Sequence, residues 1–300
     1  MASTPDPTSP PNPTSPPNPT SPPNPTSEFL TACGHEIHLM HWSKDRSEPV
    51  VMWHGLARTG RDFDPCAAHF ADRYRIVAPD TIGRGLSSWS KTPDAEYRLE
   101  HYADIAVELL DRLGIERMRW VGTSMGGAIG MVLAAGPLRD RITHLVLNDI
   151  GPALSPVAVG RIRSYVTQPP VFDTVLELEA YLRTIYAPYG AITDAQWRQM
   201  AETSTRRRDD GKVTVHYDPA VMRVFAETTD DFEMWDAWDA IRAKTLVMRG
   251  ETSDLLTQDT AEEMTRCGPK ARLAVIPGCG HAPALNVPDQ LQLIEDFLAS

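Results

Sequence analysis

The stretch Gly122-Thr123-Ser124-Met125-Gly126 is the most informative part of this chain. It fits the pattern G-x-S-x-G, in which a serine stands on a sharp turn between a strand and a helix. The short, largely apolar run 117–121 before it predicts a strand, and the small and apolar residues 125–135 predict a tightly packed helix. We expect a strained backbone at Ser124, flanked by glycines because larger side chains would collide there. The turn therefore predicts a nucleophilic serine, which an acid and a histidine must follow in that order.

Both partners follow later in the chain. Residues 244–250 form an apolar run that predicts a strand, and the loop after it carries Asp254. Residues 271–277 predict the next strand, and the glycine-flanked loop after that strand presents His281. The sequence thus predicts a triad in the order Ser124, Asp254, His281.

Two other acidic residues compete with Asp254 for the acid of this triad. Glu251 precedes Asp254 in the same loop. Asp149 follows the predicted strand 142–148, a position from which an acid could also reach the histidine. We favour Asp254 over both alternatives because it falls just past the end of a late strand.

An oxyanion hole is expected beside the serine. Residues 48–53 predict a strand that leads into His54-Gly55, and this pair lets the next backbone N–H point at the site. The N–H groups of Leu56 and Met125 would then stabilise the charge on a carbonyl oxygen. His54 is expected to be structural, with hydrogen bonds under this loop, rather than a second base.

Together these motifs resemble the α/β-hydrolase superfamily, in its branch of small, lid-bearing serine esterases, lactonases and carbon–carbon bond hydrolases. The resemblance covers roughly residues 28–300 and rests on five motifs: His54-Gly55, the D-x-x-G-x-G-x-S loop 80–87, the Ser124 turn, residues 250–254 and Gly280-His281. Residues 54–63 and 80–89 are also similar to those of intracellular 3-hydroxybutyrate-oligomer hydrolases. The resemblance implies a mostly parallel sheet with helices on both faces, and no metal or organic cofactor. Residues 56–60 depart from the G-P-G of ring-cleavage-product hydrolases, which argues against carbon–carbon cleavage.

The alternation of strands and helices stops after Ile150 and resumes at Lys244. We therefore expect a core of residues 28–151 and 237–300, interrupted by a helical lid over 152–236, where this superfamily carries its lid. Tyr186, Tyr217 and Trp235 are the aromatic residues expected to face the substrate. The alternative is that the aromatic residues of this segment form a small core of their own.

Composition limits the kinds of partner that this protein is expected to bind. The net charge of −11 argues against binding to nucleic acid or an anionic membrane, and no apolar run is long enough to cross a bilayer. The four cysteines have no metal-binding spacing, so free thiols in a reducing cytoplasm are expected. Residues 1–27 repeat Thr-Ser-Pro-Pro-Asn-Pro and predict an extended, disordered tail. The sequence gives no information on oligomeric state.

The expected activity is hydrolysis of small or medium apolar esters through an acyl-enzyme, hydroxyalkanoate oligomers among them. A lactonase, a carbon–carbon bond hydrolase or a perhydrolase could use the same triad. The alternative to an enzyme is a non-catalytic ligand receptor with the same fold. An intact triad and both turn glycines argue against that receptor.

Overall fold

The computed structural model describes residues 25–165, 169–227 and 232–300. The predicted disordered tail therefore lies outside the described residues, apart from its last three. Of these three, Thr26 and Ser27 already belong to the first strand.

An eight-stranded sheet forms the centre of the protein, in the order β1-β2-β4-β3-β5-β6-β10-β11. β1 and β2 form an antiparallel hairpin, and β2 also runs antiparallel to β4. All the other pairs are parallel, as the alternating pattern predicted. The strands are β1 (Thr26–Ala32), β2 (His35–Trp42), β3 (Pro49–Trp53), β4 (Arg75–Pro79), β5 (Met118–Thr123), β6 (Ile142–Asn148), β10 (Lys244–Gly250) and β11 (Arg272–Ile276).

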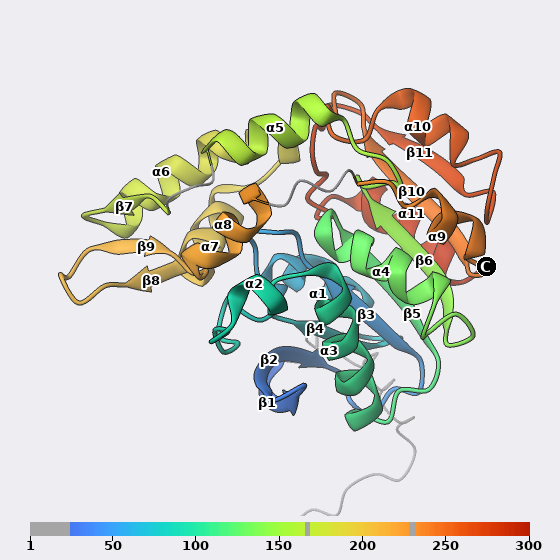
Figure 1. Cartoon of the computed structure of the whole chain (residues 1–300), viewed down its shortest axis with the longest axis horizontal. Coiled ribbons are helices and arrows are strands. Elements are labelled where there is room, and N and C mark those ends of the chain that lie inside the picture. Colours follow the sequence, from blue (N-terminus) through green and yellow to red (C-terminus); the bar gives the residue numbers. More distant parts are fainter. Residues whose placement is uncertain (1–24, 166–168, 228–231) are drawn as a thin grey trace, which may run out of the picture.

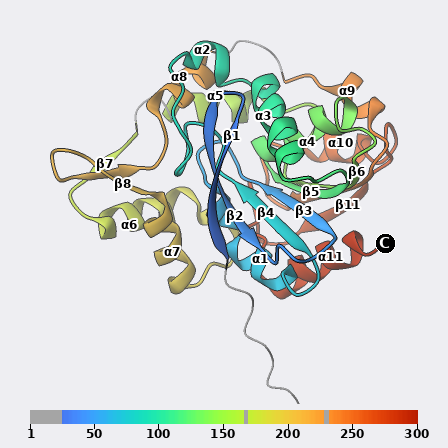
Figure 2. The ribbon, with the colours of Figure 1, turned by 90° about the horizontal axis from the view of Figure 1, so that it is seen from below.

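Helices cover both faces of the sheet, so the core has three layers (Figures 1 and 2). One face carries α3 (Leu99–Arg112), α4 (Met125–Ala135), α9 (Trp235–Ala240) and α10 (Gln258–Glu263). The other face carries α1 (Asp64–Phe70) and α11 (Pro288–Leu298). Two short helices, η1 (Gly60–Phe63) and α2 (Pro93–Glu96), lie in the connections after β3 and β4.

Strand β3 illustrates why the sheet is buried on both sides. Its alternate residues enter different cores: Val51 and Trp53 pack with α3 and α4, whereas Val50 and Met52 pack with α1 and α11. The side chains of all four are fully buried. An apolar run without polar alternation is typical of a parallel strand covered by helices on both faces.

The segment between β6 and β10 lies mostly to one side of the sheet (Figure 1). It was predicted to be helices and loops, but it also contains a small antiparallel sheet in the order β7-β9-β8. These strands have only two or three residues each, too few to show an alternating pattern in the sequence. The elements are α5 (Pro156–Tyr165), β7 (Val171–Phe172), α6 (Val175–Ile185), η2 (Ala187–Tyr189), α7 (Asp194–Ser204), β8 (Thr205–Arg207), β9 (Val213–Val215) and α8 (Pro219–Glu227).

All four cysteines have free thiols. In the described parts of the chain, no helix combines the length and the apolar character that a membrane span requires.

Candidate active site

The serine turn has the strained geometry that its sequence predicted. β5 ends at Thr123, α4 begins at Met125, and Ser124 between them has φ +51° and ψ −118°. A Cβ atom at Gly122 would lie 2.3 Å from the carbonyl oxygen of Gly126, and one at Gly126 would lie 2.0 Å from that of Trp53. Both glycines are therefore required because backbone atoms occupy the space of a side chain.

His281 connects this serine to a buried carboxylate. The imidazole Nε2 lies 3.0 Å from Ser124 Oγ, and Nδ1 lies 3.2 Å from Asp149 Oδ2. Asp149 is completely buried, whereas the side chain of His281 retains 19% exposure. With the ring proton on Nδ1 facing the carboxylate, Nε2 is free to accept the serine proton. This geometry suits nucleophilic attack by a serine.

The structure brings Asp149, and not Asp254, to His281, which corrects the pairing expected from the sequence. Asp254 instead forms an ion pair with Arg161 of α5, at 2.5 Å, and its side chain is 52% exposed. Glu251, the other alternative, accepts a hydrogen bond from the N–H of Gly278 at 2.9 Å. Helix α5 therefore holds Asp254, the acid expected from the sequence, through Arg161.

Asp149 is held rigidly at the end of β6. Its N–H donates to the carbonyl of Met248 in the neighbouring strand β10, at 2.8 Å. The residue before it, Asn148, donates from its side chain to the carbonyl of Pro283 at 2.8 Å, in the histidine loop. The same strand end thus holds the acid and fixes the loop that carries His281.

The loop after β3 lies against the serine, as an oxyanion hole requires. A Cβ atom at Gly55 would lie 3.7 Å from Ser124 Cβ, so the next residue, Leu56, is close to the turn. Met125 follows Ser124 directly and is the first residue of α4, where helix N–H groups lack partners within the helix. No other described residue accepts a hydrogen bond from the N–H of Leu56 or of Met125. Both donors are available to a ligand.

His54 holds this loop by hydrogen bonds, which is the structural role expected for it. Its Nδ1 lies 2.7 Å from the Gly55 carbonyl, and its Nε2 accepts from the N–H of Thr81 at 2.9 Å. Burial lowers the pKa of His54 to about 4, despite the opposing effect of nearby Asp80. The ring is therefore neutral at pH 7, and both of its nitrogens are occupied.

The role of Arg84 in the site was not expected from the sequence. It is fully buried, and its Nε donates to the carbonyl of Leu56 at 2.9 Å. Its Nη1 donates to Tyr102 Oη at 2.7 Å, and its Nη2 lies 3.4 Å from Met125 Sδ. One guanidinium therefore contacts both residues of the candidate oxyanion hole. The one sequence feature that could have indicated this role is the position of Arg84 between the two glycines of the loop 80–87.

A cavity of about 720 Å³ opens onto Ser124 and His281. Two of the three predicted substrate-binding residues, Tyr186 and Tyr217, line it. Trp235 is not among the lining residues; it begins α9, which packs on the core, and is partly buried against that core. Apolar side chains from the inserted segment form much of the remaining wall: Leu154, Val159, Ile162, Ile185, Val215, Met222, Phe225, Phe232 and Met234.

The inserted segment is attached to the loops of the site at two places. Arg58, two residues after Leu56, binds Asp62 with two hydrogen bonds, and its guanidinium lies 4.9 Å from the ring centre of Tyr186. The short helix η2 accepts a hydrogen bond from Gly280 N–H at the Pro188 carbonyl, at 2.7 Å. The segment therefore contacts both the oxyanion loop and the histidine loop.

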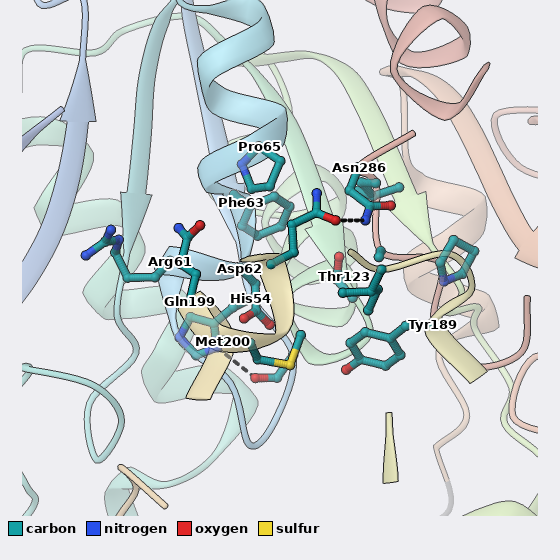
Figure 3. Close-up of a pocket in the computed structure, with 16 residues that line it drawn as sticks. His54, Arg61, Asp62, Phe63, Pro65, Thr123, Tyr189, Gln199, Met200 and Asn286 are labelled. Atoms are coloured by element: carbon teal, nitrogen blue, oxygen red, sulfur yellow. Dashed lines mark hydrogen bonds between the residues drawn. The ribbon is translucent and has the colours of Figure 1, made fainter. Parts of the chain in front are cut away.

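A second, smaller pocket of about 60 Å³ lies behind the serine turn (Figure 3). His54 and Thr123 line it together with residues of η1 and α7, and Asn286 closes it by a hydrogen bond to Gln196 at 3.1 Å. A space of this size holds a few water molecules. Of the two, only the larger cavity has room for a ligand of more than a few atoms.

Comparison with known proteins agrees with this fold. The family model of the alpha/beta hydrolase fold matches residues 48–286. The chain belongs to this family and is a hydrolase.

Individual relatives extend the comparison. A 3-hydroxybutyrate-oligomer hydrolase from Cupriavidus necator is 38% identical over 274 residues, covering 88% of this chain and 92% of that protein. A 2-(acetamidomethylene)succinate hydrolase from Mesorhizobium japonicum is 26% identical, over 77% of this chain and 81% of that protein. The crystal structure of an alpha/beta hydrolase from Novosphingobium aromaticivorans superposes with a TM-score of 0.82 at 33% identity, covering 92% of this chain and 98% of that one.

Proposed function

We propose that this protein is a serine ester hydrolase that works through an acyl-enzyme. The observation that carries the proposal is the hydrogen-bonded series from Ser124 Oγ through His281 to Asp149, with distances of 3.0 and 3.2 Å, at the wall of a large cavity. Besides the substrate and water, the proposed reaction uses these three side chains and the backbone N–H groups of Leu56 and Met125.

In the proposed reaction, Ser124 Oγ attacks the ester carbonyl while His281 Nε2 takes the hydroxyl proton. Asp149 orients the ring and stabilises its protonated form. The N–H groups of Leu56 and Met125 bind the oxyanion, and losing one such donor costs on the order of 3 kcal/mol of transition-state stabilisation. The protonated His281 then gives its proton to the leaving alcohol. Water, activated by the same ring, attacks the acyl-enzyme and releases the acid and the free serine.

For the substrate, we propose short hydroxyalkanoate oligomers, in particular esters of 3-hydroxybutyrate. The support is the 38% identity to a hydrolase of that name, together with the cavity. A volume of about 720 Å³ with a mostly apolar wall suits a small ligand of alternating ester and alkyl groups. The segment 152–236 would act as a lid over this substrate, because its residues supply much of the cavity wall.

The experiment uses the full chain with p-nitrophenyl esters from acetate to octanoate, a 3-hydroxybutyrate dimer and a simple lactone. We expect hydrolysis of the dimer and the shorter esters, loss of activity in Ser124→Ala, and covalent labelling of Ser124 by a fluorophosphonate. Labelling of another residue, or full activity in Ser124→Ala, would contradict the serine mechanism. Activity on esters but not on the dimer would reject only the substrate assignment.

A further inference from the structure

Three side chains that commonly bind metals meet on a part of the molecule that the proposed reaction does not use. His35 is the first residue of β2, Glu96 is the last residue of α2, and His101 lies in the first turn of α3. Each offers one donor atom, and these three atoms lie within 4.8 Å of one another. They come from two distant parts of the sequence, joined where α3 packs beside the β1–β2 hairpin (Figures 1 and 2).

The spacing of these atoms fits a zinc ion. His35 Nε2 lies 3.2 Å from Glu96 Oε2. A tetrahedral zinc ion with bonds of about 2.0–2.1 Å holds neighbouring donors about 3.3 Å apart. This pair is therefore already at metal-binding distance, and the donor atom of His101 lies within 4.8 Å of both. Two imidazoles and one carboxylate are a common zinc ligand set, which water completes.

Two serine hydroxyls contact the cluster in the way that hydrogen-bonding partners orient metal ligands. Ser88 Oγ lies 3.5 Å from Nδ1 of His35, the ring nitrogen opposite the one facing Glu96. Ser90 donates a short hydrogen bond from its hydroxyl to Glu96 Oε2. Such partners fix the ring orientation and the carboxylate position, and they contribute to metal affinity.

His101 provides an independent observation. Its Nε2 is buried, and no described residue forms a hydrogen bond with it. The ring stands edge-on to His35, with ring centres 5.7 Å apart and an angle of 81°. A buried ring nitrogen without a partner is unfavourable, so it calls for an explanation. A metal ion bound through that nitrogen would remove this cost.

We propose that His35, Glu96 and His101 bind one zinc ion, which ties the β1–β2 hairpin to the wall of the substrate cavity. The residues between the second and third ligands, Tyr97, Arg98, Leu99 and Glu100, all line that cavity. The ion would hold this wall in place from behind, without touching the substrate.

The test titrates Zn²⁺, and Co²⁺ as a spectroscopic probe, into the full chain after removal of metals by a chelator. We expect one equivalent to bind, with visible Co²⁺ absorption typical of a tetrahedral site and a raised melting temperature. His101→Ala and Glu96→Gln should each weaken binding by about tenfold or more. The matched control is His69→Ala, because His69 and Glu295 form a similar pair at 2.9 Å on α1 and α11. This control should bind as the unaltered protein does.

Three results would overturn the proposal: no stoichiometric binding, equal affinity in His101→Ala and the unaltered protein, or loss of binding in His69→Ala. Circular dichroism of each metal-free variant separates loss of the site from loss of the fold. Glu96→Gln, which preserves size and shape, provides a second variant if His101→Ala does not fold. No substrate is used, so the result is independent of the proposed ester hydrolysis.

Discussion

The acid that faces His281 is decided by two loops at the ends of neighbouring strands. Asp149 follows β6 directly, and Asp254 lies four residues beyond the end of β10, which pairs with β6. The carboxyl ends of parallel strands meet at one edge of a sheet, so the sequence pattern alone places both acids within reach of the histidine. Two features that the sequence does not display separate them: the left-handed backbone of Asp149, φ +57°, and the partner Arg161 that occupies Asp254.

The contacts of Arg84 predict that this residue positions the oxyanion loop. Arg84→Met removes the hydrogen bonds to the Leu56 carbonyl and to Tyr102, so we expect the oxyanion loop to shift. A small misplacement of reacting groups can cost about 100-fold in rate. We expect kcat to fall on that order, with a smaller change in KM.

Arg84→Lys should lose nearly as much, because an ammonium cannot reproduce the fork of a guanidinium. Arg112→Met is the control, since Arg112 is an exposed residue of α3 that pairs with Glu108. Measurements of kcat and KM for ester hydrolysis by the three variants test this prediction. Unchanged kcat in Arg84→Met would show that Arg84 does not position the loop.

At the scale of elements, the turn from β5 to α4 depends on close packing of backbone against backbone. We predict that Gly126→Ala lowers the free energy of unfolding by about 3 kcal/mol or more, because the new Cβ would lie 2.0 Å from the Trp53 carbonyl oxygen. Denaturant unfolding measures this loss.

Gly160→Ala is the matched substitution. Gly160 is exposed in the interior of α5, and a Cβ there would have nothing within 4 Å. We expect this variant to be unchanged or up to about 1 kcal/mol more stable, because alanine favours the helix. Equal effects of the two substitutions would mean that the tight turn contributes nothing to stability.

Much of the element pattern could be predicted from the sequence. The strand 244–250 and the helix 125–135 have the predicted bounds, because long apolar runs and a glycine-bounded turn give strong local signals. The small sheet of β7, β8 and β9 could not be predicted, since strands of two or three residues depend on tertiary pairing. The same holds for Trp235, whose position depends on how the inserted segment returns to α4.

For the whole molecule, His54 predicts how stability depends on pH. Its pKa is about 4 in the folded protein and about 6.5 in an unfolded chain. Between these values the unfolded chain binds the extra proton, so the stabilisation is present above pH 6.5 and is lost as pH falls toward 4. The full shift corresponds to roughly 3 kcal/mol.

Urea unfolding at pH 7 and pH 4.5 measures this effect. The free energy of unfolding should be lower at pH 4.5, and His54→Asn should be less stable at pH 7 with a smaller difference between the two conditions. An identical pH dependence in His54→Asn would contradict the assignment to His54.

The central claim is that Ser124, His281 and Asp149 act together on an ester. The most direct test compares kcat/KM for p-nitrophenyl butyrate in Asp149→Asn and Asp254→Asn. We predict a loss on the order of 10⁴-fold for Asp149→Asn, because the amide favours the wrong ring tautomer. Asp254→Asn should change the rate by only a few-fold, since an exposed ion pair contributes about 0–1 kcal/mol. A large loss in Asp254→Asn, with near-normal activity in Asp149→Asn, would contradict the account.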